Sequence, residues 1–190
     1  MTKTRKVLRT LVVLGLVGGI AAAGAFSAFS SQTENPDNVV ATGTVSLNDN
    51  DLDSPLYSIA AGRPGSTDEH CIRVNYTGSL PATVRIYRPD AVDANLAPHV
   101  NVTIQPGTAG SFNCAGFVPD GAAIYNNTLS AMPTSYAAST IQDFPGSTTA
   151  WGNGDFVVYK VTATVSASAP NSAQGRTTGL HRLVWEAQNQ

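Results

Sequence analysis

Cysteine, methionine and lysine are scarce in this chain, and the short motifs that mark common catalytic sites are missing. Only two of its 190 residues are cysteine and two are methionine. The three histidines, His70, His99 and His181, are widely spaced, so no H-E-x-x-H pair places two zinc-binding imidazoles on one helical face. No G-x-S-x-G elbow surrounds a nucleophilic serine. The sequence therefore predicts no catalytic residue and no cofactor, although a triad assembled from distant positions would leave no such motif.

Charge is also sparse, at 13% of residues, and the cations gather at the start of the chain. Lys3, Arg5, Lys6 and Arg9 are followed by an uncharged run from 10 to 33. Cations before an apolar segment, here 11–23, and then small residues form the layout of an export signal. Cleavage after Ala25 or after Ser27 satisfies the need for small residues, and we expect 1–27 to be a signal peptide.

An uncleaved membrane anchor is the alternative, because the uncharged run is long enough to cross a hydrocarbon core of about 30 Å. Much of the run is Gly, Ala and Ser, which favours a cleavable signal over a permanent span. We therefore expect a protein secreted to the extracellular matrix or cell surface, with membrane contact only through the signal peptide before cleavage.

Residues 28–190 are expected to form a single domain, and this part of the chain is acidic. It keeps seven of the eleven cations against thirteen carboxylates, and Lys160 is its only lysine. Phosphate backbones and anionic lipids attract basic surfaces, so nucleic acid and anionic membranes are excluded as expected partners.

The two cysteines, Cys71 and Cys114, would reach an oxidising compartment after export, and a disulfide is the leading interpretation. Closing that loop would stabilise the fold by about 4 kcal/mol in the chain-entropy model. Two buried free thiols are the alternative. Metal binding by two isolated thiolates is disfavoured because tetrahedral sites use closely spaced pairs.

Hydrophobic residues alternate with period two through most of the chain, and short Gly, Pro and Ser turns separate the alternating runs. This pattern predicts an all-β, antiparallel β-sandwich. The segments 70–76 and 82–87, joined by the turn 77–81, are predicted to form a hairpin. Three-to-four spacing between 124 and 139 predicts one or two short helices. Strands are predicted at 39–47, 70–76, 82–87, 99–104, 156–165 and 177–187.

One carboxylate cluster, Asp49, Asp51 and Asp53, has the D-x-D-x-D opening of a calcium loop. Ser54 replaces the glycine that an EF-hand requires, and Ala60 stands where its bidentate glutamate would be, which excludes an EF-hand. A looser calcium site and a solvated acidic turn remain the two interpretations of this cluster.

Three stretches resemble the TasA/camelysin family of exported Gram-positive proteins. They are the export signal continuing into NPDNVVATGTVSL, the segment RPGSTDEHCIRVNYTGSLPATVRIY, and the closing LVWEAQN. The resemblance implies a jelly-roll sandwich, cleavage between Ser27 and Ala28 by a signal peptidase of the SipW type, and a role in biofilm-matrix fibres. Some members of the family are described as metallo-endopeptidases, but this sequence has no zinc motif to which that activity could be assigned. The cysteine pair departs from the family pattern.

Residues 28–38, AFSSQTENPDN, would be freed by that cleavage, and Pro36 bars a helix across them. We expect an extended N-terminal arm, anchored by Phe29, that adds to a sheet edge of the next copy and so builds a homopolymeric fibre. A disordered terminus is the alternative for this segment. A secreted metallo-endopeptidase and a monomeric surface adhesin are the alternative functions.

Overall fold

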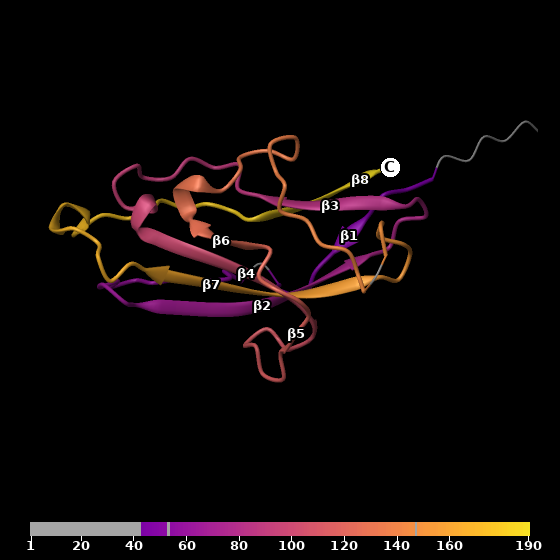
Figure 1. The fold of residues 1–190 in the computed structure, drawn as a ribbon, viewed down its shortest axis with the longest axis horizontal. Helices are drawn as coiled ribbons and strands as arrows, with labels where there is room; N and C mark the ends of the chain where they lie inside the picture. Colours follow the sequence, from indigo (N-terminus) through magenta and orange to yellow (C-terminus); the bar gives the residue numbers. More distant parts are fainter. Residues whose placement is uncertain (1–42, 53, 147) are drawn as a thin grey trace, which may run out of the picture. The chain divides into compact units, whose positions relative to one another are not determined.

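The computed structural model describes residues 43–52, 54–146 and 148–190, which form two antiparallel β-sheets facing each other (Figure 1). The larger sheet has the order β1 (Leu47–Asn48), β2 (Thr67–Tyr76), β7 (Phe156–Val165), β4 (Val100–Ala109) and β5 (Val118–Pro119), with β6 (Tyr125–Thr128) also paired to β4. The smaller sheet pairs β3 (Ala82–Tyr87) with β8 (Val184–Asn189). The prediction of an all-β antiparallel fold is confirmed.

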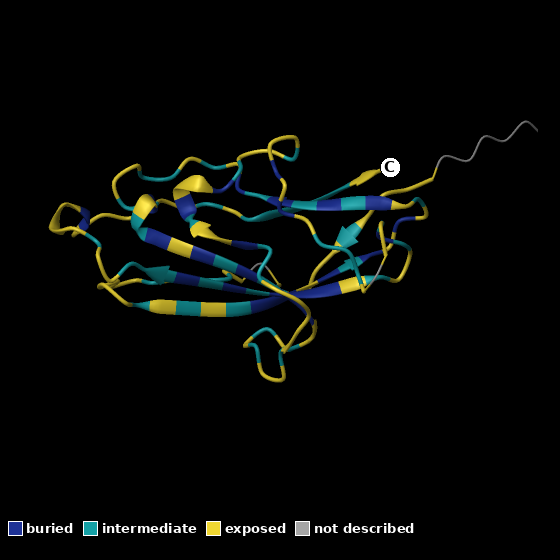
Figure 2. Cartoon of the chain, viewed as in Figure 1, coloured by how far each residue is buried: buried dark blue, intermediate teal, exposed yellow. Residues whose placement is uncertain are grey.

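Alternation along the strands directs apolar side chains into the space between the sheets (Figure 2). On β2, Ile72, Val74 and Tyr76 are at most 2% exposed, whereas Arg73 between them is exposed. The largest buried side chain is Trp151, which lies in the loop before β7. From the larger sheet the core also receives Val102, Ile104, Val157, Tyr159, Val161 and Ala163, and from β3 it receives Ala82, Val84 and Ile86.

The predicted hairpin of 70–76 with 82–87 is wrong, because these segments are β2 and β3 and belong to different sheets. Between them the chain crosses from one sheet to the other. The main-chain N–H groups of Thr77 and Ser79 donate to Ser46 and Thr44 (2.9 Å each), and the Tyr76 hydroxyl donates to the Leu80 carbonyl (2.5 Å). These bonds satisfy main-chain groups of the segment that crosses between the sheets, and no tight hairpin turn forms there.

The predicted helices at 124–139 are mostly wrong. The segment begins as β6, whose residues pair with Asn101–Ile104 of β4, and only a 3₁₀ helix, η2 (Leu129–Ala131), follows. The apolar spacing reflects a strand followed by a single turn, which together bring Tyr125, Leu129 and Met132 to the core. Two further 3₁₀ helices, η1 (Ala97–His99) and η3 (Asn171–Ala173), complete the helical content of the described residues.

Several predicted strand limits also change, among them the start of β2, which is Thr67 and not His70. Strand β4 continues past Pro106 to Ala109. The main-chain groups of Pro106 point towards β5, and its carbonyl accepts a hydrogen bond from the N–H of Asp120 (2.9 Å). The missing N–H of the proline therefore costs no hydrogen bond to β7. The last strand is Val184–Asn189, so it begins seven residues later and ends two residues later than the predicted 177–187. Of the predicted first strand, residues 39–42 lie outside the described part, and regular pairing begins at Leu47. The predicted strand at 156–165 is confirmed as β7.

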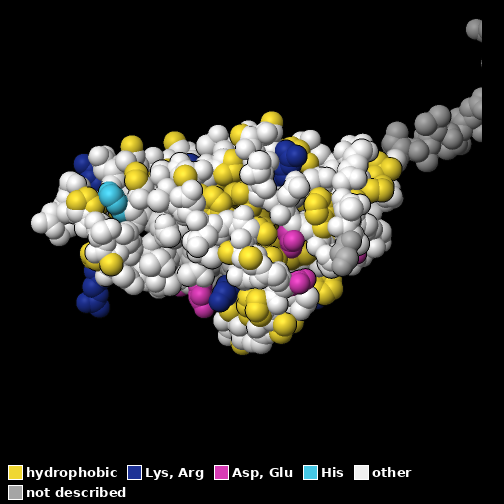
Figure 3. Space-filling view, viewed as in Figure 1, with side chains coloured by type: hydrophobic (Ala, Val, Ile, Leu, Met, Phe, Trp, Pro, Cys, Tyr) yellow, Lys and Arg dark blue, Asp and Glu magenta, His cyan; other side chains and the backbone are white. Residues whose placement is uncertain are grey.

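The outer face of the larger sheet carries mostly polar side chains and few charges. The outward positions of the larger sheet carry Thr67, Glu69, Thr103, Thr162 and Thr164, and Lys160 approaches Glu69 at 4.0 Å. Figure 3 shows one face of the molecule, on which charged side chains of both signs are few and scattered. No helix among the described residues is long and apolar enough to cross a membrane.

Candidate assembly site: an open sheet edge beside a cleft

The far side of β3, away from β8, is occupied by loop residues. Ala82 and Trp151 exchange main-chain hydrogen bonds of 3.1 and 2.8 Å, and the N–H of Ile86 donates to Ile141 (2.9 Å). Backbone groups alternate sides along an antiparallel strand, so the intervening residues of β3 are those that bond to β8. This arrangement also determines which residues of β8 face away from the sheet.

The residues of β8 that pair with those intervening positions of β3 are Val184, Glu186 and Gln188. The others direct their N–H and C=O groups away from the sheet, and they are Trp185, Ala187 and Asn189. No main-chain hydrogen bond joins these three outward positions to any other residue in the described ranges. Within the part of the chain that the structure describes, β8 therefore has an open edge in the sense that its outward main-chain groups are unpaired, although β1 lies close to the strand.

A cleft of about 1030 Å³ lies at the start of this edge, where Val184 and Trp185 of β8 line it together with residues of the larger sheet. Its rim is polar and includes Asn48, Asp49 and Asn171. Of the three outward positions only Trp185 lines the cleft, so a strand added to β8 would direct into it the inward side chains that lie beside Trp185. The apolar lining comes from both sheets and the segment between them, and includes Leu47, Leu56, Ile59, Ile72, Val74 and Trp185.

Tyr57 and His181 meet across the wall of this cleft. The Tyr57 hydroxyl lies 2.5 Å from Nε2 of His181, and the two rings are 5.5 Å apart. Nδ1 of His181 lies 2.9 Å from the Gly179 carbonyl, which can only accept, so Nδ1 carries a proton and Nε2 accepts from Tyr57 when the ring is neutral. Burial raises the pKa of Tyr57, with Arg88 opposing the shift, so Tyr57 stays protonated and can donate.

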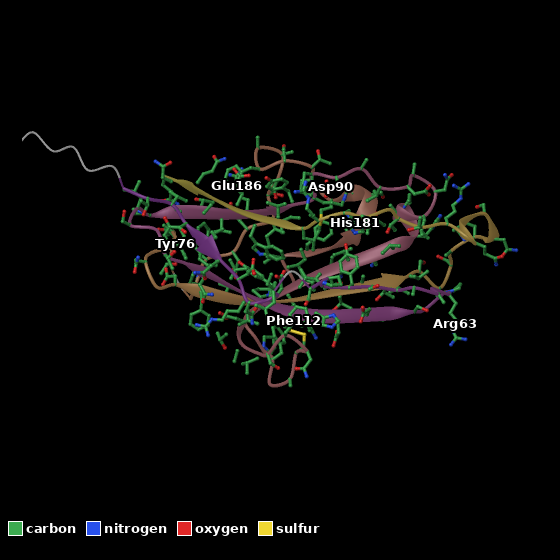
Figure 4. The ribbon with its side chains drawn as sticks, turned by 180° about the vertical axis from the view of Figure 1, so that it is seen from behind. Arg63, Tyr76, Asp90, Phe112, His181 and Glu186 are labelled. Atoms are coloured by element: carbon green, nitrogen blue, oxygen red, sulfur yellow. A yellow bond between two sulfur atoms is a disulfide. The ribbon has the colours of Figure 1, made fainter. Side chains whose placement is uncertain are left out.

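The segment 176–182 is also held by ion pairs at the same side of the molecule, where Figure 4 labels His181 and Asp90. Arg182 makes a two-pronged contact with Asp90, at 3.0 Å from Nε and 3.0 Å from Nη2. The side-chain hydrogen bond from Arg182 lowers the pKa of Asp90 below its ordinary value. Arg176 reaches Asp93 at 3.4 Å. These contacts fix the chain that leads into β8.

The predicted disulfide between Cys71 and Cys114 is confirmed, with the two Cα atoms 5.0 Å apart. It joins β2 to the loop between β4 and β5, on the face of the larger sheet that points away from β3 and β8 (Figure 4). A structural disulfide is typical of proteins in oxidising, extracellular compartments.

Of the predicted calcium ligands, Asp49 and Asp51 lie on the cleft rim after β1, and Asp53 lies outside the described residues. Within the described ranges, no group of three or more His, Cys, Asp and Glu side chains is close enough to hold a metal ion. The calcium interpretation stays a prediction. The signal cleavage residues Ser27 and Ala28, and the arm residues Phe29 and Pro36, also lie outside the described residues.

Sequence reasoning missed the open edge and the residues around the cleft, among them Tyr57, His181 and Trp185. The closing LVWEAQN indicated a strand, but its pairing partner is set by tertiary structure. A tyrosine and a histidine 124 residues apart leave no local pattern in the sequence.

Comparison of the chain with protein-family models and with curated proteins finds no match to either. The likeness to the TasA/camelysin family therefore depends only on the residue patterns described above.

Proposed function

We propose that the protein is a secreted structural subunit of extracellular matrix fibres, in which the N-terminal arm of one copy adds as a strand to β8 of the next. The observation that carries the proposal is the open edge of β8 beside the cleft. Unpaired main-chain groups on an edge strand accept an extended segment, and adjoining pockets accept its alternate side chains. The resemblance to the TasA/camelysin family supports the same role.

The arm has the length that this contact needs. Eleven extended residues, 28–38, reach about 36 Å, whereas the six residues of β8 span about 20 Å. Phe29 would supply the apolar side chain that enters the cleft. The arm and the β8 edge are different surfaces, so two joined copies still have one free arm and one free β8 edge. Further copies can add at both ends, and the assembly grows as a filament.

A proline at an outward position of β8 tests the contact without breaking the smaller sheet. Ala187→Pro removes one outward N–H, and pairing with β3 persists because proline is tolerated on the open side of an edge strand. We expect the variant to remain a folded monomer where the parent protein forms fibres visible by electron microscopy. Gln188→Ala is the matched control, since it keeps every outward main-chain group and should polymerise normally.

Deleting residues 28–38 tests the donor side of the same contact. The truncated protein should fold, make no fibres, and still accept a synthetic peptide of sequence AFSSQTENPDN. Normal polymerisation of either the truncated protein or Ala187→Pro would show that the arm and the β8 edge are not the connecting surfaces.

A further inference from the structure

The other long edge of the sandwich, along β2, differs from β8 because the chain itself occupies it. The N–H of Cys71 donates to the carbonyl of Phe112 at 2.8 Å, and the N–H of Arg73 donates to Oδ1 of Asn50 at 2.7 Å. Both bonds are made outside the β2–β7 ladder. Two outward donors of β2 are thus satisfied by loops, with no neighbouring strand at those positions.

The same edge is closed further along the chain. Asn75 pairs with Asn48 of β1, and Thr77, just after β2, donates to the Ser46 carbonyl at 2.9 Å. The outward positions 71, 73, 75 and 77 are therefore all engaged. Towards the start of β2 the edge carries Glu69, and a charged side chain at an edge opposes strand addition.

The hydrogen bond between the Phe112 carbonyl and the Cys71 N–H depends on the position of the loop between β4 and β5, which the disulfide attaches to β2. The loop between β4 and β5 crosses the outer face of the larger sheet to reach β2, where Cys114 is bonded to Cys71 and Phe112 lies beside them (Figure 4). The Phe112 ring packs on His70, with ring centroids 4.8 Å apart. Cys114 has a φ of 61°, a left-handed conformation that costs a non-glycine residue about 1 kcal/mol or more. The covalent bond helps to hold the loop against that cost.

We propose that the Cys71–Cys114 disulfide guards the β2 edge. By keeping the Phe112 carbonyl on the Cys71 N–H, it closes the β2 edge to an extended segment, and so directs self-assembly to β8 in preference to β2. The inference rests on the proposed function for its effect on assembly. A subunit with one acceptor edge grows in single file, whereas a subunit with two would branch or thicken.

The test opens the guarded edge while the β8 edge is blocked. Ala187→Pro alone should stay monomeric by size-exclusion chromatography and electron microscopy. Adding Cys71→Ser and Cys114→Ser to Ala187→Pro removes the guard, and this triple variant should regain self-association through β2. If it stays a folded monomer, the guard proposal is overturned.

A matched variant shows whether the regained association uses the outward N–H at position 71. Cys71→Pro with Cys114→Ser and Ala187→Pro also lacks the disulfide, but position 71 has no N–H to offer. This variant should remain monomeric. Association of this variant to the same extent as the serine version would contradict the proposal, because the association would then come from general destabilisation. Circular dichroism establishes that each variant is folded.

Amide hydrogen exchange tests the guard separately from fibre formation. In the parent protein, reduction of the disulfide with a phosphine should speed exchange at Cys71 by about tenfold. Exchange at Ile72 and Val74, whose N–H groups face β7, should stay slow. Unchanged exchange at Cys71 would reject the guard even if fibres form, whereas faster exchange in a protein that forms no fibres would reject only the proposed function.

Discussion

Trp151 and Ala82 exchange two main-chain hydrogen bonds, which attach the loop before β7 to the outer side of β3. Both side chains are fully buried, and the Trp151 indole N–H donates to the Asp143 carbonyl at 2.7 Å. One residue therefore fills the centre of the core and also covers a sheet edge. It leaves β8 as the open side of the smaller sheet.

Replacing Trp151 should be among the most damaging single changes. Trp151→Ala removes the largest buried side chain, and we expect it to lower the free energy of unfolding by about 3–5 kcal/mol. Trp151→Phe keeps most of the volume and loses the hydrogen bond to Asp143, so its cost should be about 1–2 kcal/mol. Urea denaturation measures both. A loss below about 1 kcal/mol for the alanine variant would contradict this account of the core.

Gly78 lies where the chain crosses from one sheet to the other. A Cβ at this position would overlap the Tyr76 hydroxyl group and lie 2.6 Å from the Thr44 carbonyl oxygen. Gly78→Ala should therefore cost about 1–3 kcal/mol in urea denaturation. Gly152→Ala is the control, because its Cβ would meet only a carboxylate oxygen of Asp155 at an ordinary 3.5 Å. Equal stability of the two variants would be inconsistent with close packing at the crossing.

The sequence predicted the strands that have a clear local pattern and missed the features set by distant contacts. Strand β7 was predicted with its observed limits because its ten residues favour strands and include no Gly or Pro, and burial alternates from Tyr159 to Thr164. The hairpin was mispredicted because 77–81 contains Gly and Pro, as turns do, whereas its main-chain groups bond to residues 44 and 46. Hydrogen bonds to a segment about 30 residues earlier in the chain therefore make 77–81 a connection between the two sheets and not a hairpin turn.

The candidate site was only partly predictable, for the same reason. Two cysteines in an exported chain were enough to predict the disulfide. In the smaller sheet, β8 is the open side because residues 141 and 151 cover the other side, along β3. No local sequence pattern encodes these contacts.

Acid should weaken the anchoring of the segment before β8. The pKa of Asp90 is held below its ordinary value of 3.8, chiefly by the hydrogen bond from Arg182. A carboxyl whose folded-state pKa is lowered contributes stability above its unfolded pKa and loses it as the pH falls through the folded value. Asp90→Asn should therefore lower the melting temperature slightly at pH 7 and reduce the loss of stability between pH 5 and pH 2. An identical pH profile for variant and parent would contradict this role.

Trp185 should report strand addition directly. Its side chain lines the cleft and lies 5.7 Å from the Tyr159 ring, and its indole N–H has no hydrogen-bond partner within the described ranges. In a Trp151→Phe background it is the only tryptophan, because the chain has two. Trp185 is half-buried, so a strand added to β8 would cover the exposed remainder of its ring, and polymerisation should shift its emission to shorter wavelength and reduce quenching by acrylamide. The same protein carrying Ala187→Pro should show neither change. Fibres that form while Trp185 remains equally quenchable would mean that subunits join at a surface other than the β8 edge.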